Sequence, residues 1–188
     1  HTLLQPGDEI AILLPNYMQI WGIAKNLDLK INTFNLCEEN GWQLDLESLK
    51  QAITPQTKLI AVCNPNNPTG YILTSEEMNA IVNAAAEVGA FILADEVYAG
   101  AERITEKVTP SFYGLYDKVV AMGSMSKAYG LPGLRLGWAV GPADTINKIL
   151  RITVSNIDIN HMRKPICTSF LVHTFINPDF FKLFKIIA

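Results

Sequence analysis

Short apolar runs alternate along the chain with longer segments whose apolar residues recur at helical spacing. Six runs have the length and apolar content of buried strands: Ile10–Leu14, Ile31–Leu36, Leu59–Cys63, Phe91–Ala94, Val119–Gly123 and Leu136–Val140. Four segments have a helical pattern: Tyr17–Leu27, Asp45–Ala52, residues 75 to about 88 and residues 143 to about 153. This alternation predicts a three-layer α/β fold, with a mostly parallel sheet of about six strands and helices on both faces.

The third helical segment has clear signals at both ends. Thr74 or Ser75 is a suitable N-cap, and Glu76 and Glu77 place negative charge in the first turn, where the helix dipole favours it. Gly89 is a suitable C-terminal stop. We therefore expect this helix to end close to Gly89.

Polar residues that could take part in catalysis or binding follow several of the predicted strands. In a parallel sheet of this type, the chemistry lies beyond the carboxyl ends of the strands. Asp95 comes directly after an apolar run, and a carboxylate there is costly unless it is paired, for example as a helix cap or in a salt bridge. Lys127 lies in a turn rich in small residues. If that turn is partly buried, a depressed lysine pKa would suit Schiff-base chemistry, and the alternative is a solvated lysine.

Four features occur together in a fixed order: Asn67-Pro-Thr-Gly70, Asp95-Glu-Val-Tyr98, Ser124-Met-Ser-Lys127 and Arg135. This set resembles the signature of class I/II aminotransferases, which are fold-type I pyridoxal-phosphate enzymes. The resemblance covers about residues 8–156. It implies a large-domain fold with a strand over residues 136–140 that can run antiparallel, and a cis peptide between Asn67 and Pro68.

The resemblance also implies the reaction and its catalytic residues. The cofactor would be pyridoxal 5'-phosphate, and the reaction would transfer an amino group between an amino acid and a 2-oxo acid. Lys127 would form a Schiff base with the cofactor and then act as general base. Asp95 would pair with the pyridine nitrogen and keep it protonated, which makes the ring an electron sink. Tyr98 would hydrogen-bond the phenolic oxygen of the ring.

The same resemblance assigns further cofactor contacts. Asn67 would share the phenolic oxygen with Tyr98, whereas Ser124 and Arg135 would bind the phosphate. Tyr17 stands where the family has an aromatic ring stacked on the cofactor, although a tyrosine near a helix start can equally be a core or rim residue. These residues are our candidate site.

The end of the chain departs from the family pattern. We expect residues 1–156 to form the pyridoxal-phosphate-binding large domain, incomplete at its N-terminus, and residues 157–188 to form a divergent or truncated tail. The tail could be an ordinary helix packed on the sheet, a divergent start of the small domain, a membrane-surface helix, an artefact or a frameshifted end. The family's glycine-rich phosphate turn and its carboxylate-binding arginine have no counterpart here. We therefore expect the 188 residues alone to retain cofactor weakly and not to transaminate.

Composition limits the kinds of partner, metal site and cellular location that the chain can be expected to have. The formal net charge of -3 gives no reason to expect nucleic acid, and no apolar stretch is long enough to span a membrane. Three separated cysteines and three scattered histidines form no metal-ligand pattern, and they favour a reducing, cytoplasmic location. A homodimer is expected for the full-length parent. The alternatives to a transaminase are a lyase, decarboxylase or synthase of the same fold, or an inert truncated domain, because the cofactor supports each reaction.

Overall fold

The described residues build one sheet covered by helices. The structure is a computed structural model that describes residues 2–103, 105–155, 176–177 and 181–187. Within them the strands are β1 Glu9–Leu14, β2 Lys30–Cys37, β3 Gln43–Leu44, β4 Thr57–Cys63, β5 Phe91–Asp95, β6 Val119–Ser124, β7 Leu136–Pro142, β8 Ile176–Asn177 and β9 Phe181–Ile187. The helices are α1 Gln19–Asn26, α2 Leu46–Ala52, α3 Ser75–Val88 and α4 Ala143–Ser155, with 3-10 turns η1 Glu38–Asn40 and η2 Pro132–Leu134. All six predicted strands and all four predicted helices are present.

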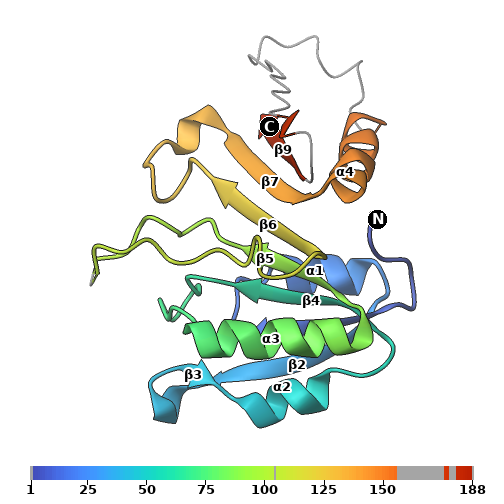
Figure 1. The fold of residues 1–188 in the computed structure, drawn as a ribbon, viewed down its shortest axis with the longest axis vertical. Helices are drawn as coiled ribbons and strands as arrows, with labels where there is room; N and C mark the ends of the chain where they lie inside the picture. The colour runs from blue at the N-terminus through green and yellow to red at the C-terminus, as the bar shows by residue number, and fades with distance from the viewer. Residues whose placement is uncertain (1, 104, 156–175, 178–180, 188) are drawn as a thin grey trace.

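The strand order is β3-β2-β1-β4-β5-β6-β7-β9-β8 (Figure 1). The five strands from β2 to β6 in this order run parallel. Strand β7 runs antiparallel to β6, as the family resemblance implies. The order reverses between β1 and β4, because β2 lies on one side of β1 and the later strands lie on the other. Such a reversal is where open α/β sheets commonly bind ligands, beyond the carboxyl ends of the strands.

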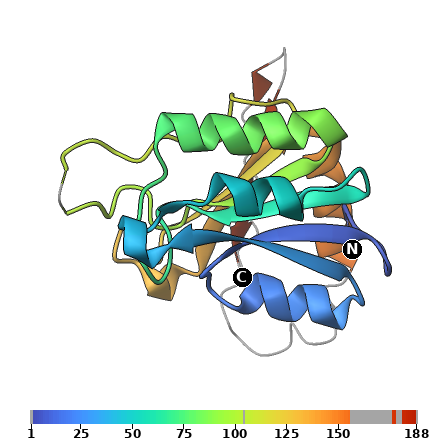
Figure 2. The same ribbon diagram turned by 90° about the horizontal axis from the view of Figure 1, so that it is seen from below.

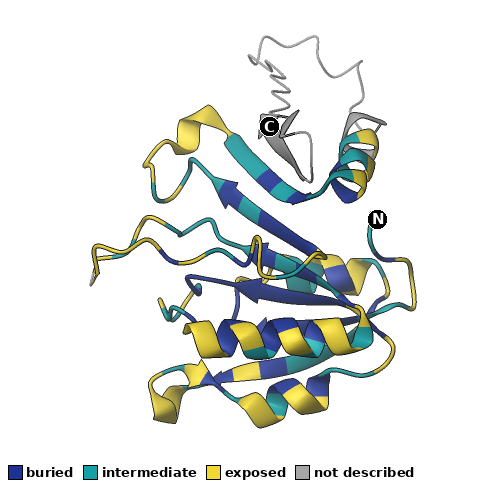
Figure 3. Cartoon of the chain, viewed as in Figure 1, coloured by how far each residue is buried: buried dark blue, intermediate teal, exposed yellow. Residues whose placement is uncertain are grey.

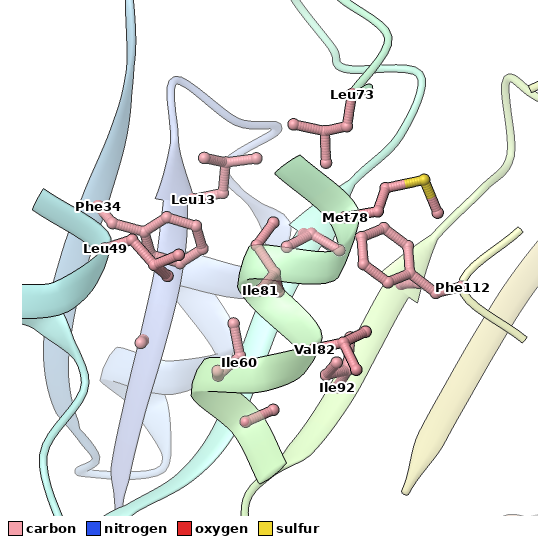
Figure 4. Close-up of a cluster of buried hydrophobic side chains, with 14 of the residues drawn as sticks. Leu13, Phe34, Leu49, Ile60, Leu73, Met78, Ile81, Val82, Ile92 and Phe112 are labelled. Atoms are coloured by element: carbon pink, nitrogen blue, oxygen red, sulfur yellow. The ribbon is translucent and has the colours of Figure 1, made fainter. Parts of the chain in front are cut away.

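The core consists of layers on both faces of the sheet. Helices α2 and α3 cover one face and α1 covers the other (Figure 2). The larger cluster joins α3 to the strands through Met78 and Ile81, which pack with Ile60 and Ile92 (Figure 4). All four side chains are at most 1% exposed. The central strands are accordingly buried along most of their length, whereas the outer surface of α3 is exposed (Figure 3).

The tail differs from one expectation. Residues 176–177 and 181–187 are strands, and β9 pairs antiparallel with β7 along its whole length, so the expectation of a helix is wrong for these residues. The sequence Phe181-Lys-Leu-Phe-Lys-Ile-Ile187 is rich in aromatic and β-branched residues, which favours a strand once an open edge such as that of β7 is available. The rest of the expected tail lies outside the described residues.

Helix α3 allows a direct test of its predicted cap. The Thr74 side chain accepts a hydrogen bond from Glu77 N at 3.2 Å, and the Glu77 carboxylate accepts one from Thr74 N at 2.7 Å, which completes a capping box. We expect Thr74→Ala to lower the free energy of unfolding by about 1 kcal/mol. Chemical denaturation measures this, with the exposed Ser75→Ala as the matched control. Equal stabilities of the two variants would contradict the role of the cap.

Candidate active site

Loops from the carboxyl ends of the parallel strands meet at one cavity. Its volume is about 390 Å³, and its lining residues are Tyr17, Gln19, Cys63, Asn67, Asp95, Val97, Tyr98, Ser124, Ser126, Lys127, Pro132 and Arg135. All seven candidate residues identified in the sequence are among them. They span residues 17 to 135, so only the assembled sheet brings them together. Their chemical roles stay predictions.

Asp95 is the last residue of β5 and is half-buried. Its carboxylate accepts a hydrogen bond from Val97 N at 3.2 Å and has no cationic partner among the described residues. Burial raises the pKa of Asp95, and the bond from Val97 only partly offsets this. Among the described residues Asp95 therefore neither caps a helix nor forms a salt bridge, and its carboxylate lines the cavity without a charge partner there.

Lys127 lies in the turn that follows β6, and its side chain is exposed. The turn is partly buried, as expected, because Gly123 is buried and Ser126 and Ala128 are half-buried, but Lys127 itself is on the exposed side of it. The Tyr129 ring, although exposed, packs edge-on against Trp138, with ring centroids 6.1 Å apart. The Lys127 Nζ atom lies 5.5 Å from the centroid of the Tyr98 ring. This distance places the cation within reach of the ring face.

Asn67 lies in a loop that other asparagines hold in place. Asn64, at the start of this loop, accepts a hydrogen bond from Leu73 N at 2.9 Å, and its own N donates to Asp95 O. The Asn66 side chain donates to Pro15 O at 3.0 Å, which ties the loop to the turn before Tyr17. The Asn67–Pro68 peptide is cis, as expected, and the Leu14–Pro15 and Asn64–Pro65 peptides are cis as well. The Asn67 carboxamide and the Tyr98 hydroxyl have no hydrogen-bond partner among the described residues, so both are available to a ligand.

Ser124 and Arg135 lie at another part of the same cavity, where β6 ends and β7 begins. The Ser124 hydroxyl accepts a hydrogen bond from Ser126 N at 3.0 Å and lies 2.9 Å from Ser126 Oγ. Arg135 has a left-handed backbone, with φ of 49°, and donates from Nη1 to Pro132 O at 3.2 Å. Its guanidinium is exposed and retains further donors. Two hydroxyls and a guanidinium together suit an anion.

The sequence reasoning missed part of the cavity wall. Cys63 ends β4, pairs in register with Asp95, and is 1% exposed. Burial, followed by the nearby Asp95 charge, raises the pKa of the Cys63 thiol to about 12, so this thiol stays neutral. Its position directly before the Asn64-Pro65 turn was the available signal. Ser126 could have been found from its place between Ser124 and Lys127, whereas Gln19 carried no signal.

The described residues show neither a metal-binding cluster nor a membrane-spanning helix. Within them, no three His, Cys, Asp or Glu residues gather closely enough to hold a metal ion. The helices of the same residues are too short or too polar to cross a membrane.

Comparison with known proteins shows which family has this fold and sequence. The profile of the family "Aminotransferase class I and II" matches residues 1–171. An aspartate aminotransferase from Musicola paradisiaca (strain Ech703) is 35% identical over 153 residues, which cover 80% of this chain and 38% of that protein. A PLP-dependent aminotransferase from Streptococcus suis 89-1591 superposes with a TM-score of 0.76 at 39% identity, covering 83% of this chain and 41% of that one. An aspartate aminotransferase from Thermus thermophilus with maleate gives 0.75 at 27% identity, covering 82% and 40%.

The fold is therefore that of the fold-type I pyridoxal-phosphate enzymes, with a mostly parallel sheet between layers of helices. Within that class, the chain belongs to the class I and II aminotransferase family. It spans about two fifths of the length of the relatives it matches.

Proposed function

We propose that this chain forms the cofactor-binding part of a pyridoxal-phosphate-dependent aminotransferase, which transfers an amino group between an amino acid and a 2-oxo acid. One observation carries the proposal. A single cavity is lined by a primary amine, Lys127, and by a carboxylate without a cationic partner, Asp95, together with Asn67 and Tyr98. Family membership supports the same reaction class.

The residues of the cavity fit the cofactor. Asp95 is half-buried, its pKa is raised by burial, and no cation of the described residues pairs with it. A carboxylate in this condition is stabilised by a protonated ring nitrogen, which supplies both a positive charge and a hydrogen-bond donor. Cys63 beside it is neutral and does not compete for that position. Pyridoxal phosphate, when bound, supplies the aldehyde that captures an amino group and the ring that accepts the electrons released at the α-carbon.

Each residue then has a task that its chemistry allows. Lys127 supplies the amine that holds the cofactor covalently and, when released, acts as the base that moves the α-proton. Tyr98 and Asn67 would hold the phenolic oxygen through the hydroxyl and the carboxamide, which have no hydrogen-bond partner among the described residues. Ser124 and Arg135 bind the phosphate by a hydroxyl and by a charge-assisted fork.

Tyr17 completes the proposed binding site. It follows β1, lines the cavity and is 58% exposed, so one ring face is available for stacking on an aromatic cofactor. We extend the proposal to a homodimer, since Tyr129, Leu131 and Leu134 also expose apolar surface beside the cavity. The described free thiols, Cys37 and Cys63, favour a cytoplasmic location.

The test measures binding and reaction separately. On addition of pyridoxal phosphate to the chain, we expect a visible absorbance band and a borohydride-stable adduct located at Lys127 by mass spectrometry. The full product of the gene, given an amino acid, should lose that band and release the corresponding 2-oxo acid. Release of carbon dioxide or ammonia in its place would identify a decarboxylase or lyase. Labelling that is spread evenly over all lysines would contradict the proposed site.

A further inference from the structure

The connection from β5 to β6, residues 96–118, begins with a long excursion, described over residues 96–103 and 105–112, that carries Tyr98. It extends away from the sheet and returns to it (Figure 1). Its two ends are joined by Glu96, whose carboxylate accepts hydrogen bonds from Ser111 Oγ at 2.7 Å and Phe112 N at 2.8 Å. This carboxylate closes the base of the excursion where it leaves the sheet.

A second carboxylate closes the excursion farther out. One oxygen of Glu102, Oε1, accepts hydrogen bonds from Gly100 N at 3.1 Å, from Thr109 N at 2.8 Å and from Thr109 Oγ1. Thr109 is 6% exposed, so the bonds connect Gly100 to an anchored residue on the returning limb. Glu102 Oε1 thus accepts from three donors, which come from both limbs of the excursion.

Gly100, which Glu102 holds, lies against the turn after β6 that contains Lys127. It has a φ of +90°, and a Cβ added to it would lie 3.5 Å from Ala128 Cβ, next to Lys127 in the chain. The turn between Tyr98 and Gly100 is closed by Ala101 N, which donates to Tyr98 O at 2.9 Å. Glu102 therefore holds the turn that presents the Tyr98 ring to the Lys127 ammonium, 5.5 Å from its centroid.

We propose that Glu102 is a positioning residue, which fixes Gly100 against Ala128 and thereby sets how the Tyr98 ring faces the Lys127 amine. Glu102 is not among the residues that line the site cavity. The geometric claim stands on its own, whereas its effect on the reaction rests on the proposed function. A small displacement of Tyr98 would change both its hydrogen bond to the phenolic oxygen and the environment of the amine, and errors of about 1 Å can cost on the order of 100-fold in rate.

The protonation state of Glu102 is consistent with this task. Burial by itself would raise the pKa of Glu102, but the hydrogen bonds from Thr109 and Gly100 outweigh it and lower the pKa to about 2. The carboxylate is thus ionised across the working pH range. Its bonds to the backbone are charge-assisted and do not switch with ordinary changes of pH.

The test reads the contact between Tyr98 and Lys127 without any cofactor. Lysines are reductively dimethylated with 13C-formaldehyde and a borane reductant, which preserves their charge, and the Lys127 signal is identified by its loss in Lys127→Arg. In the unchanged chain we expect this signal to be displaced upfield of the exposed Lys107 by the ring current of Tyr98. In Glu102→Ala the displacement should be lost. In Glu102→Gln, which keeps an acceptor oxygen without the charge, the displacement should be intermediate. Glu106→Ala removes an exposed charge from the same excursion and should leave the signal unchanged.

Borohydride trapping with pyridoxal phosphate separates this proposal from the preceding one. We expect adduct formation at Lys127 to fall several-fold in Glu102→Ala and to stay unchanged in Glu106→Ala. If the Lys127 signal responds to Glu102 as expected but no adduct forms in the unchanged chain, the positioning role stands and the proposed function fails. If the signal is the same in the unchanged chain, Glu102→Ala and Glu102→Gln, the positioning role is wrong. Should Glu102→Ala fail to fold, Glu102→Gln alone decides.

Discussion

Replacing Lys127 with alanine is expected to reduce the borohydride-trapped adduct with pyridoxal phosphate to the background level of exposed lysines. Lys127 is the one lysine among the residues that line the cavity with Asp95 and Tyr98. A cofactor bound there would therefore meet no other described amine at its aldehyde. In the full gene product, kcat should fall by about 100- to 10,000-fold, the range typical for loss of a positioned acid–base group. Peptide mass spectrometry measures the adduct, and 2-oxo acid release measures the rate.

Two variants make this result specific. Lys127→Arg keeps a positive charge near the Tyr98 ring but cannot form the covalent bond, so it should also fail to trap. Lys107→Ala removes an exposed lysine from the excursion between β5 and β6 and should trap as well as the unchanged chain. Normal trapping in Lys127→Arg would move the reactive amine to another lysine and end the assignment.

Replacing Asp95 with asparagine is expected to weaken cofactor binding and to stabilise the chain without cofactor. The carboxamide keeps the shape of the side chain but loses its charge. A charge-assisted hydrogen bond contributes roughly 1.5–3 kcal/mol, so the dissociation constant for pyridoxal phosphate should rise by roughly 10- to 150-fold. Absorbance titration measures this change, and Asp117→Asn, at an exposed acidic residue outside the cavity, is the matched control.

The stability effect of Asp95→Asn has a definite pH dependence. The folded-state pKa of Asp95 is raised by burial above its ordinary value of 3.8, so the folded chain disfavours the ionised form. Below the ordinary pKa both side chains are neutral, and the variant should have little advantage. As the pH rises from there through the raised pKa, the unchanged chain incurs the full penalty, and the advantage of the variant reaches its maximum. Denaturation at pH 3 and pH 7 tests this, and a variant that is less stable at pH 7 would contradict it.

The regular elements could be predicted because each has a local cause. The apolar run Leu59–Cys63 of β4 is buried on both faces of the sheet, whereas β5 buries Ile92 and Ala94 fully and Phe91 and Leu93 partly, and apolar runs of this kind indicate such burial directly. The two ends of helix α3 were indicated by Thr74 and Gly89, which adopt the expected N-cap and left-handed conformations. The candidate site was accessible for another reason, namely that several linked motifs identify one family.

What could not be predicted depends on contacts between distant residues. Strand β3 has two residues, too few for any periodicity, and it exists because Leu44 N donates to the Glu77 carboxylate and Leu36 pairs with Leu44. Glu102 has the sequence context of a solvated loop charge, and only the return of the chain at Thr109 gives it partners. The exposure of Lys127 was likewise invisible, because a run of small residues is compatible with either a covered or an open turn.

The reversal of strand order between β1 and β4 has a consequence for how the chain folds. Tyr17 follows one of these strands and Asn67 follows the other, while Lys127 and Arg135 lie between β6 and β7, farther along the sheet. No local piece of the chain holds the cavity, so a partly folded chain has nothing for a ligand to recognise. Any ligand of the cavity therefore binds only the native state, and at 100 times its dissociation constant it would add about 2.7 kcal/mol to the unfolding free energy. Cofactor supply would then act on the lifetime of the protein as well as on its activity, because a chain without ligand spends more time open to proteases.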